Sequence, residues 1–330
     1  MTRLLTCIFL AVTLLSAPLR AQCAGENLFA SMDPDRLAAI TAAADAVPFP
    51  RGNHWRATRG DEVITIIGTY HFDDPRHAAT LDAIAPALAS AATVLVEAGP
   101  DEEAALLGRI ASDPGIMMIT EGPTLVERLP PETWDKLSTA LSARGMPSFM
   151  SAKLQPWYVA VMLAIPPCAM AQMTDPKGLD GLVIDAALSA GVPVRALEPF
   201  DTIFTLFGAM TEDEIVAMID STLTVEDRAE DYFATLADSY FSGTSRMIWE
   251  YMRDESRRLP GYTPERIEAD FARMEELLMS ARNRVWIPVL TDAAAEGPVF
   301  AAFGALHLSG EDGVLNLLQK EGFRLEELPL

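Results

Sequence analysis

The sequence predicts an α/β protein with a mostly parallel sheet flanked by helices. Apolar, β-branched runs alternate with Ala- and Leu-rich segments in the first half of the chain, which is typical of β-α-β units. The stretch over about 201–295 is almost wholly helical in pattern. A buried apolar run then returns over 299–303 and is followed by the same short motif as the first run. We therefore expect a single domain over 22–330, with a helical insert between two strand-Gly-x-x-His units.

The first half of the chain supplies three of the expected strands. The strands over 62–67 and 93–96 enclose one helical segment, so they should run parallel. A later helix should end at Gly191, a residue type common just after helices. The expected elements are strand 62–67, helix 75–92, strand 93–96, helix 131–143, helix 178–190 and strand 192–197.

Two helix starts are marked within the insert. Thr211 precedes three acidic residues, which favour a helix N-terminus. Thr263 precedes Pro264, the pattern of an N-cap followed by proline at the first helical position. The second of these helices should bury one apolar face. That face consists of Met274, Leu277, Leu278, Ala281 and Val285. After the insert we expect strand 299–303, helix 310–320 and strand 323–328.

Composition excludes several classes of partner. The formal net charge is -22 and the sequence pI is about 4.5, so a nucleic-acid partner and an anionic membrane surface are both disfavoured. The apolar run over 157–165 is bracketed by prolines and is shorter than the roughly 20 residues of a membrane span. We therefore expect no nucleic-acid partner and no membrane span after signal removal. A peptide or small-molecule substrate is the expected partner that the site described below implies.

The N-terminus has the pattern of a secretory signal peptide over 1–21. Arg3 is followed by an apolar run over 4–16 and by a cleavage site after Ala21. A membrane anchor is a weaker interpretation, because the run is short of the roughly 20 residues required. Lipidation of Cys23 is also disfavoured, since Gln22 stands where a small residue is expected. The predicted location is the periplasm or the outside of the cell.

Export leaves two cysteines in the mature chain, Cys23 and Cys168. In an oxidising compartment these two thiols can form one disulfide, which is our prediction. Two inert buried thiols are the alternative. A zinc site is disfavoured because neither cysteine has a partner at metal-ligand spacing.

One short pattern occurs twice, each time after an apolar run. Gly68 is followed three residues later by His71, and Gly304 is followed three residues later by His307. A glycine at a strand end adopts conformations that other residues avoid and allows close approach to a ligand. The carboxyl ends of parallel strands meet at the edge where α/β proteins bind ligands. Two imidazoles there indicate a metal site or an acid/base pair.

Two glutamates end the other predicted strands of this edge, Glu97 and Glu198. Two His and two Glu suit a divalent transition metal, because imidazole suits Zn, Fe, Co or Ni and carboxylates extend the choice to Mn. Alternatively, one glutamate acts as general base. The competing interpretation is a pair of partly buried histidines and two solvent-facing glutamates. The remaining histidines, at 54 and 77, lack the repeated pattern and are expected at the surface.

Arg282 and Asn283 lie beside the predicted apolar face near its end. They could bind a carboxylate or a developing oxyanion, although charged residues on a helix more often face solvent. The sequence contains no His-Glu-x-x-His, no Gly-x-Ser-x-Gly and no Gly-x-x-x-x-Gly-Lys motif.

These motifs, in this order, resemble the TraB/GumN family, which is related to the Tiki proteins, and the C-terminal region is closest to the bacterial GumN-like branch. The matching residues are 68–71, Glu97, Gly178-Leu179-Asp180, Leu197-Glu198, Arg282-Asn283 and 304–323. The resemblance implies an α/β core with two Gly-x-x-His motifs. Tiki proteins are described as metal-dependent proteases that use Mn or Co, which implies His71, His307, Glu97 and Glu198 as candidate ligands.

The sequence therefore predicts an exported metal-dependent hydrolase, with cleavage of a peptide bond as the preferred reaction. Two alternatives stay open. The first is a binding protein that sequesters a peptide or a glycan without turnover, as a pheromone-shutdown role in the family would allow. The second is a non-peptide esterase, because erythromycin esterase-like proteins resemble the family distantly.

Overall fold

A computed structural model describes residues 23–174, 178–258 and 261–330, so the predicted signal peptide over 1–21 lies outside the described residues. The α/β prediction is confirmed: a six-stranded sheet has the order β4-β3-β5-β2-β1-β6. Strands β4, β3, β5 and β2 run parallel, whereas β1 and β6 are antiparallel to their neighbours. The strands are β1 (His54–Arg59), β2 (Glu62–Thr69), β3 (Thr93–Val96), β4 (Val194–Ala196), β5 (Val299–Gly304) and β6 (Arg324–Glu327).

Strand β5 lies at the centre of the sheet and pairs in parallel with both β2 and β3. All six of its residues are buried, which explains its continuous apolar sequence. The prediction that strands 62–67 and 93–96 form a parallel pair is therefore right about their direction and wrong about their being neighbours. The two strands are parallel, but β5 separates them, because a strand from the C-terminal part of the chain completes the sheet.

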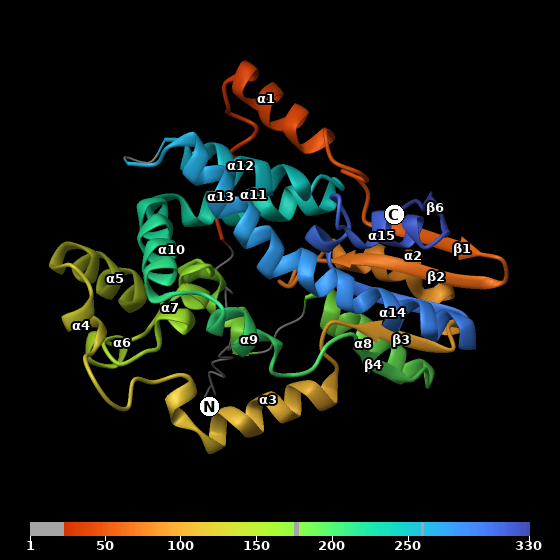
Figure 1. Ribbon diagram of the computed structural model, residues 1–330, viewed down its shortest axis with the longest axis horizontal. Coiled ribbons are helices and arrows are strands. Elements are labelled where there is room, and N and C mark those ends of the chain that lie inside the picture. Colours follow the sequence, from red (N-terminus) through yellow and green to blue (C-terminus); the bar gives the residue numbers. More distant parts are fainter. Residues whose placement is uncertain (1–22, 175–177, 259–260) are drawn as a thin grey trace, which may run out of the picture.

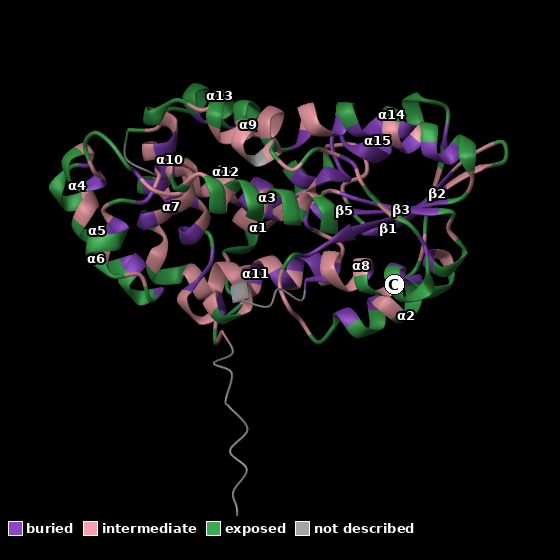
Figure 2. Cartoon of the chain, turned by 90° about the horizontal axis from the view of Figure 1, so that it is seen from below, coloured by how far each residue is buried: buried purple, intermediate pink, exposed green. Residues whose placement is uncertain are grey.

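Helices cover both faces of the sheet (Figure 2). Helices α14 (Ala281–Glu296) and α15 (Val314–Lys320) cover one face, and α2 (His77–Ser90) and α8 (Leu179–Ala190) cover the other. Successive residues of β5 point to opposite faces, as a strand requires. Accordingly Ala301 and Phe303 pack into one core with Trp286 of α14, whereas Phe300 and Ala302 belong to the other. None of the described helices combines 18 or more residues with the hydropathy that a membrane span needs.

A second helical region stands beside the sheet, at the left of Figure 1, and has its own core. Leu137, Val159 and Ile219 meet there from α5, α7 and α10. The other helices are α1 (Pro34–Asp45), α3 (Pro100–Ser112), α4 (Leu125–Arg128), α5 (Pro131–Ala143), α6 (Ser148–Ser151), α7 (Pro156–Leu163), α9 (Thr202–Gly208), α10 (Glu212–Thr224), α11 (Ala229–Phe241), α12 (Arg246–Ser256) and α13 (Pro264–Glu275). Of these, α11 also contributes Ala237 and Tyr240 to the core that Phe300 and Ala302 join. Helices from before β4 therefore join those of the predicted insert.

The expected apolar face after Thr263 begins as predicted, with Met274 packed against a buried cluster, but it is wrong at Leu278 and Val285, because the helix changes its winding. Helix α13 passes through a π turn over Glu276–Ser280 before α14 begins. A π turn adds a residue to one turn and rotates everything that follows it about the helix axis. Consequently Leu278 is 36% exposed and Val285 is 59% exposed. Asn283 and Trp286 are buried instead, facing the sheet.

The surface positions expected for the other two histidines are also wrong. His54 lies on β1, a strand that the sequence analysis did not predict, and is 5% exposed. His77 begins α2 and is 1% exposed. A ring nitrogen of each imidazole contacts a backbone carbonyl, from Pro329 at 3.0 Å and from Phe72 at 2.9 Å. Each histidine is therefore buried with at least one hydrogen-bonding partner.

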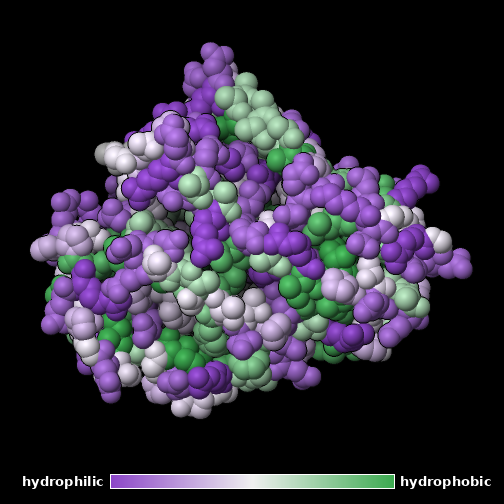
Figure 3. Space-filling model, viewed as in Figure 1, coloured by the Kyte–Doolittle hydropathy of each residue, from purple (hydrophilic) through white to green (hydrophobic). Residues whose placement is uncertain are grey.

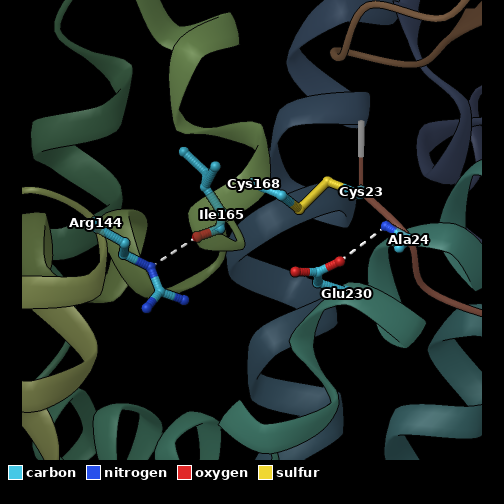
Figure 4. Close-up of a disulfide and its surroundings, with 6 residues drawn as sticks. All are labelled: Cys23, Ala24, Arg144, Ile165, Cys168 and Glu230. Atoms are coloured by element: carbon cyan, nitrogen blue, oxygen red, sulfur yellow. Dashed lines mark hydrogen bonds between the residues drawn. A yellow bond between two sulfur atoms is a disulfide. The ribbon is translucent and has the colours of Figure 1, made fainter. Parts of the chain in front are cut away.

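A disulfide joins Cys23 to Cys168, with their Cα atoms 5.2 Å apart (Figure 4). The chain after Cys23 then lies against α11. The amide of Ala24 donates to Glu230 at 2.8 Å, and the amide of Leu28 donates to the Thr235 hydroxyl at 2.8 Å. The disulfide therefore ties this N-terminal segment, and through it α11, to the turn that precedes α8.

We expect loss of this disulfide to lower stability. Replacing both Cys23 and Cys168 by Ser should reduce the free energy of unfolding by about 2–5 kcal/mol, because the bond closes a long loop in the unfolded chain. Urea unfolding of the variant, and of wild-type protein with and without reductant, measures the change. Wild-type protein whose unfolding midpoint does not respond to reductant would contradict this expectation.

Candidate functional site

The four predicted site residues of the sheet lie at the carboxyl ends of neighbouring strands. His71 follows β2, Glu97 follows β3, Glu198 follows β4, and His307 follows β5. Since these strands are adjacent and parallel, their ends share one edge. Arg282, at the start of α14, reaches the same place. The structure thus brings together residues that are far apart in the sequence.

Gly304 marks the centre of this group. A Cβ atom at Gly304 would lie 3.2 Å from Glu97 Oε1, 3.4 Å from His71 Nε2 and 3.6 Å from His307 Cδ2. Because 3.4 and 3.6 Å are measured to one point, the two imidazoles approach within about 7 Å. Any larger residue would push its side chain into this space. The second motif glycine, Gly68, has a different role: a Cβ there would be 2.6 Å from Leu308 Cδ1.

His71 is held by a carboxylate from α8. Its Nδ1 donates to Asp180 Oδ2 at 2.7 Å, and the Thr69 hydroxyl donates to the other oxygen of Asp180. The negative charge of Asp180 raises the pKa of His71 to about 9. Water reaches the His71 side chain, which is 62% exposed, and screens part of this interaction. His71 is therefore the solvent-facing and positively charged imidazole of the pair.

His307 has the opposite environment. It is 5% exposed, and its ring packs against Trp286 with centroids 4.4 Å apart. Asn283 Nδ2 donates to the carbonyl of Asp312, so Asn283 Oδ1 accepts from His307 Nδ1 at 2.6 Å. Burial lowers the pKa of His307 to about 3, and the positive charge of Arg282 acts in the same direction. His307 is therefore neutral, with the Nε2 lone pair directed toward Arg282.

Arg282 contacts three of the four predicted residues. Its Nη2 donates at 2.6 Å to both Glu97 Oε2 and Glu198 Oε1, and its Nε donates to Glu198 Oε2 at 2.8 Å. Its Nη1 donates to His307 Nε2 at 3.2 Å. Trp286 completes the arrangement, because its ring lies under the guanidinium and its Nε1 donates to Glu198 at 3.0 Å. The Arg282 side chain is only 15% exposed.

Glu97 is ionised in this environment. Its Oε1 accepts from the Gly304 amide at 2.6 Å, and its Oε2 accepts from Arg282. Burial opposes ionisation, but neighbouring positive charge and the hydrogen bond from the Gly304 amide outweigh it and hold the pKa of Glu97 below its ordinary value. Since His307 is neutral at pH 7, that charge comes from Arg282 and His71. Glu97 is thus an anion at pH 7, close to both imidazoles.

The donor atoms suit a transition metal in kind, but a cationic side chain lies among them. Within the described part of the chain, no three His, Cys, Asp or Glu side chains form a ready metal-binding group. Arg282 instead donates hydrogen bonds to Glu97, Glu198 and His307. The two imidazoles nevertheless have the orientation typical of metal ligands, with each Nδ1 bonded to an outer acceptor.

Sequence patterns did not identify three residues of the site, namely Asp180, Thr69 and Trp286. Asp180 carried a signal only through the resemblance to the family. Trp286 follows Arg282 by four residues, which places both on one helix face. Thr69 lies inside the first motif, where it shares Asp180 with His71.

Replacing Asp180 by Asn should lower the pKa of His71 from about 9 toward its ordinary value, because the negative charge that stabilises the imidazolium is lost. An NMR titration of the metal-free protein measures this pKa. Asp185→Asn removes an exposed charge from the same helix and should leave His71 unchanged. An equal pKa of His71 in the two variants would contradict the conclusion that Asp180 raises it.

Comparison with known proteins agrees with the predicted family. A family model described as the TraB/PrgY/gumN family matches residues 53–327, a range that includes both Gly-x-x-His motifs, both glutamates and Arg282. We found no significant match to a curated protein or to a solved structure. The family model covers most of the chain and every residue of the site, so this chain belongs to the TraB/PrgY/gumN family.

Proposed function

We propose that this chain is an exported, metal-dependent hydrolase that cleaves peptide bonds. One observation carries the proposal. His71 and His307 each have Nδ1 bonded to an outer acceptor, Asp180 or Asn283, and both rings and Glu97 Oε1 lie within 3.6 Å of the point that a Cβ atom at Gly304 would take. Outer partners of this kind are typical of metal-binding histidines. An ion would replace the Arg282 N–H that His307 Nε2 accepts and the proton that the charged His71 carries on Nε2.

The proposed ligands are His71, His307 and Glu97. Two imidazole nitrogens and a carboxylate oxygen match Mn, Co or Zn. The contacts of Glu198 favour another role, because both of its oxygens accept hydrogen bonds from Arg282 and one also accepts from Trp286. Glu198 would orient Arg282. A bound divalent ion would supply Lewis acidity at the scissile carbonyl group.

The side chains around these ligands have distinct tasks in the proposal. Arg282 provides a fixed positive charge in a largely buried place, where such a charge stabilises a developing oxyanion most strongly. Glu97 is ionised at neutral pH, as both a ligand and a proton acceptor require. The solvent-facing position of His71 gives a substrate its approach to the centre.

A second candidate is a metal-independent esterase, and one observation favours it. Arg282 already places positive charge between Glu97 and Glu198 and beside His307. In that case His71, oriented by Asp180, would transfer the proton and Arg282 alone would stabilise the oxyanion. Resistance of turnover to a chelator separates this candidate from the first.

We expect the purified mature protein to bind about one divalent ion per chain and to cleave peptides in its presence. His71→Ala and His307→Ala should lose both the ion and the turnover. Metal analysis, and peptide-library digestion with Mn, Co or Zn and then with chelator, measure these outcomes. His54→Gln and His77→Gln remove imidazoles outside the site and should retain the ion. Stoichiometric retention of a peptide without cleavage under any metal would replace the hydrolase by a sequestering protein.

Conservative variants should distinguish the roles of Glu97, Glu198 and Arg282. Glu97→Gln should weaken binding of the ion or lower kcat by roughly 10² or more. Glu198→Gln should keep the ion and act through Arg282. Arg282→Lys keeps the positive charge but loses the planar guanidinium that donates to both carboxylates. We therefore expect kcat to fall while the protein still binds the ion.

Arg284→Lys, on the exposed side of the same helix, is the matched control for Arg282→Lys. Equal kinetics of these two variants would remove Arg282 from the proposed mechanism.

A further inference from the structure

Helix α11 holds the chain around the first Gly-x-x-His motif, and the proposed function gives this contact no role. Hydrophilic residues cover much of the face in Figure 3, whereas aromatic rings, among them the buried Tyr70 and Tyr240, gather beside the candidate site. Helix α11 lies on the same side of the sheet as α8 (Figure 2), and its Tyr240 joins the core that contains Ile67 and Ala302. The end of α11 therefore packs against the strand ends that carry the site.

The backbone of Gly68 extends past the end of β1 and takes its hydrogen-bonding partners from elsewhere. The ladder between β1 and β2 ends at the pair of His54 and Ile67, one residue before Gly68. The Gly68 amide donates to the carbonyl of Asn53 at 2.7 Å, and the Gly68 carbonyl accepts from the Tyr240 hydroxyl at 2.9 Å. Asn53 Nδ2 in turn donates to the Tyr240 carbonyl at 2.6 Å. Asn53 and Tyr240 are 5% and 2% exposed, so water competes little for these bonds.

Gly68 also touches the segment that carries the second motif. A Cβ atom at Gly68 would lie 2.6 Å from Leu308 Cδ1 and 3.0 Å from the Cα atom of Ala305. Leu308 and Ala305 are neighbours of His307 in the chain, so a displacement of Gly68 changes how the two motifs pack. The Tyr240 hydroxyl therefore bonds to the residue at which the two motifs meet.

The residues on either side of His71 pack against α11 as well. The ring of Tyr70 stacks on Tyr240, with centroids 5.5 Å apart and the planes inclined by 23°. The ring of Phe72 meets Phe233 edge to face, with centroids 4.8 Å apart. His71, between these two aromatic residues, bonds to α8 instead. Helix α11 thus fixes the backbone from which the His71 imidazole reaches the candidate site.

A second polar contact between α11 and this segment is exposed. Arg76 Nη1 donates to Asp238 Oδ1 at 2.9 Å, but the two side chains are 43% and 45% exposed. Water and salt screen such a pair, so it contributes little to a fixed geometry. The buried bond from the Tyr240 hydroxyl to Gly68 is therefore the stronger polar anchor of the two.

We propose that Tyr240 is a positioning residue of the candidate site, which holds Gly68 so that His71 reaches the centre beside Gly304. Tyr240 is buried and acts through the backbone of the motif. This inference rests on the proposed function for the task of His71, but the position of the imidazole can be measured without turnover. A misplacement of about 1 Å can lower a rate by roughly 10²-fold, so even a small displacement of His71 should be measurable.

Tyr240→Phe tests the proposal, because it keeps the stacked ring and removes only the hydroxyl. In metal-free protein labelled with ¹³C-histidine, the imidazole NMR signal of His71 at pH 7 should move from its wild-type position. In assays with ion and substrate, kcat should fall about 10-fold while KM stays within about twofold, since Tyr240 is buried away from substrate.

Tyr232→Phe is the matched control. It removes a hydroxyl from the same helix, where the ring of Tyr232 stacks on Tyr251, and should change neither the His71 signal nor kcat. Circular dichroism and the thermal midpoint establish that each variant is folded. If Tyr240→Phe does not fold, Asn53→Ala replaces it, because it removes the amide that donates to the Tyr240 carbonyl and should move the same signal.

In an active protein the proposal requires both changes in the hydroxyl variant. A reduced kcat with an unmoved His71 signal would overturn it, as would a moved signal with an unchanged kcat. Wild-type protein without turnover under any metal would reject the hydrolase, and the NMR signal would still decide the role of Tyr240. In that case a moved signal supports the positioning role and an unmoved signal overturns it, so the two failures are distinguishable.

Discussion

The pairing of Arg282 with Glu97 and Glu198 is the interaction on which the candidate site depends. All three side chains are largely buried, at 15%, 20% and 11% exposure. Removing one partner of such a pair leaves an uncompensated buried charge and costs about 3–5 kcal/mol. Strands β3 and β4 are thus followed by Glu97 and Glu198, two buried carboxylates that require one cation between them. Helix α14 must therefore cross this edge of the sheet with Arg282 turned inward.

The π turn before α14 is consistent with that requirement. A regular helix from Thr263 onward would have buried Leu278 and Val285, as their spacing predicts. The extra residue in the turn rotates α14, so that Asn283 and Trp286 face the sheet and both apolar residues are exposed. Exposing apolar surface is unfavourable, and the ionic, hydrogen-bonding and stacking contacts made by Arg282, Asn283 and Trp286 offset it. Single π turns inside α-helices frequently mark functional sites.

Sequence patterns predicted the parallel core and the convergence of strand ends, because both follow from local rules. A strand such as β5 is apolar along its whole length, and parallel strands align their carboxyl ends. What could not be predicted depends on contacts between distant segments. Asp180 contacts His71 only after α8 packs below the sheet, and β1 exists only as a partner of β2 and β6. Periodicity likewise contains no signal for a π turn.

The two Gly-x-x-His motifs look equivalent in the sequence, yet the fold gives their imidazoles different chemistry. His71 faces solvent beside the carboxylate of Asp180, and the pKa of His71 is raised to about 9. His307 is buried beside the uncharged amide of Asn283, and the pKa of His307 is lowered to about 3.

Environments that separate the pKa values of paired groups are typical of sites that need an acid and a base at one pH. The charge of Asp180 for His71 and burial for His307, rather than the repeated motif, therefore set the protonation of each ring. Asp180 and Asn283 come from different helices, so a repeated local motif acquires two roles only when the whole chain has folded around it.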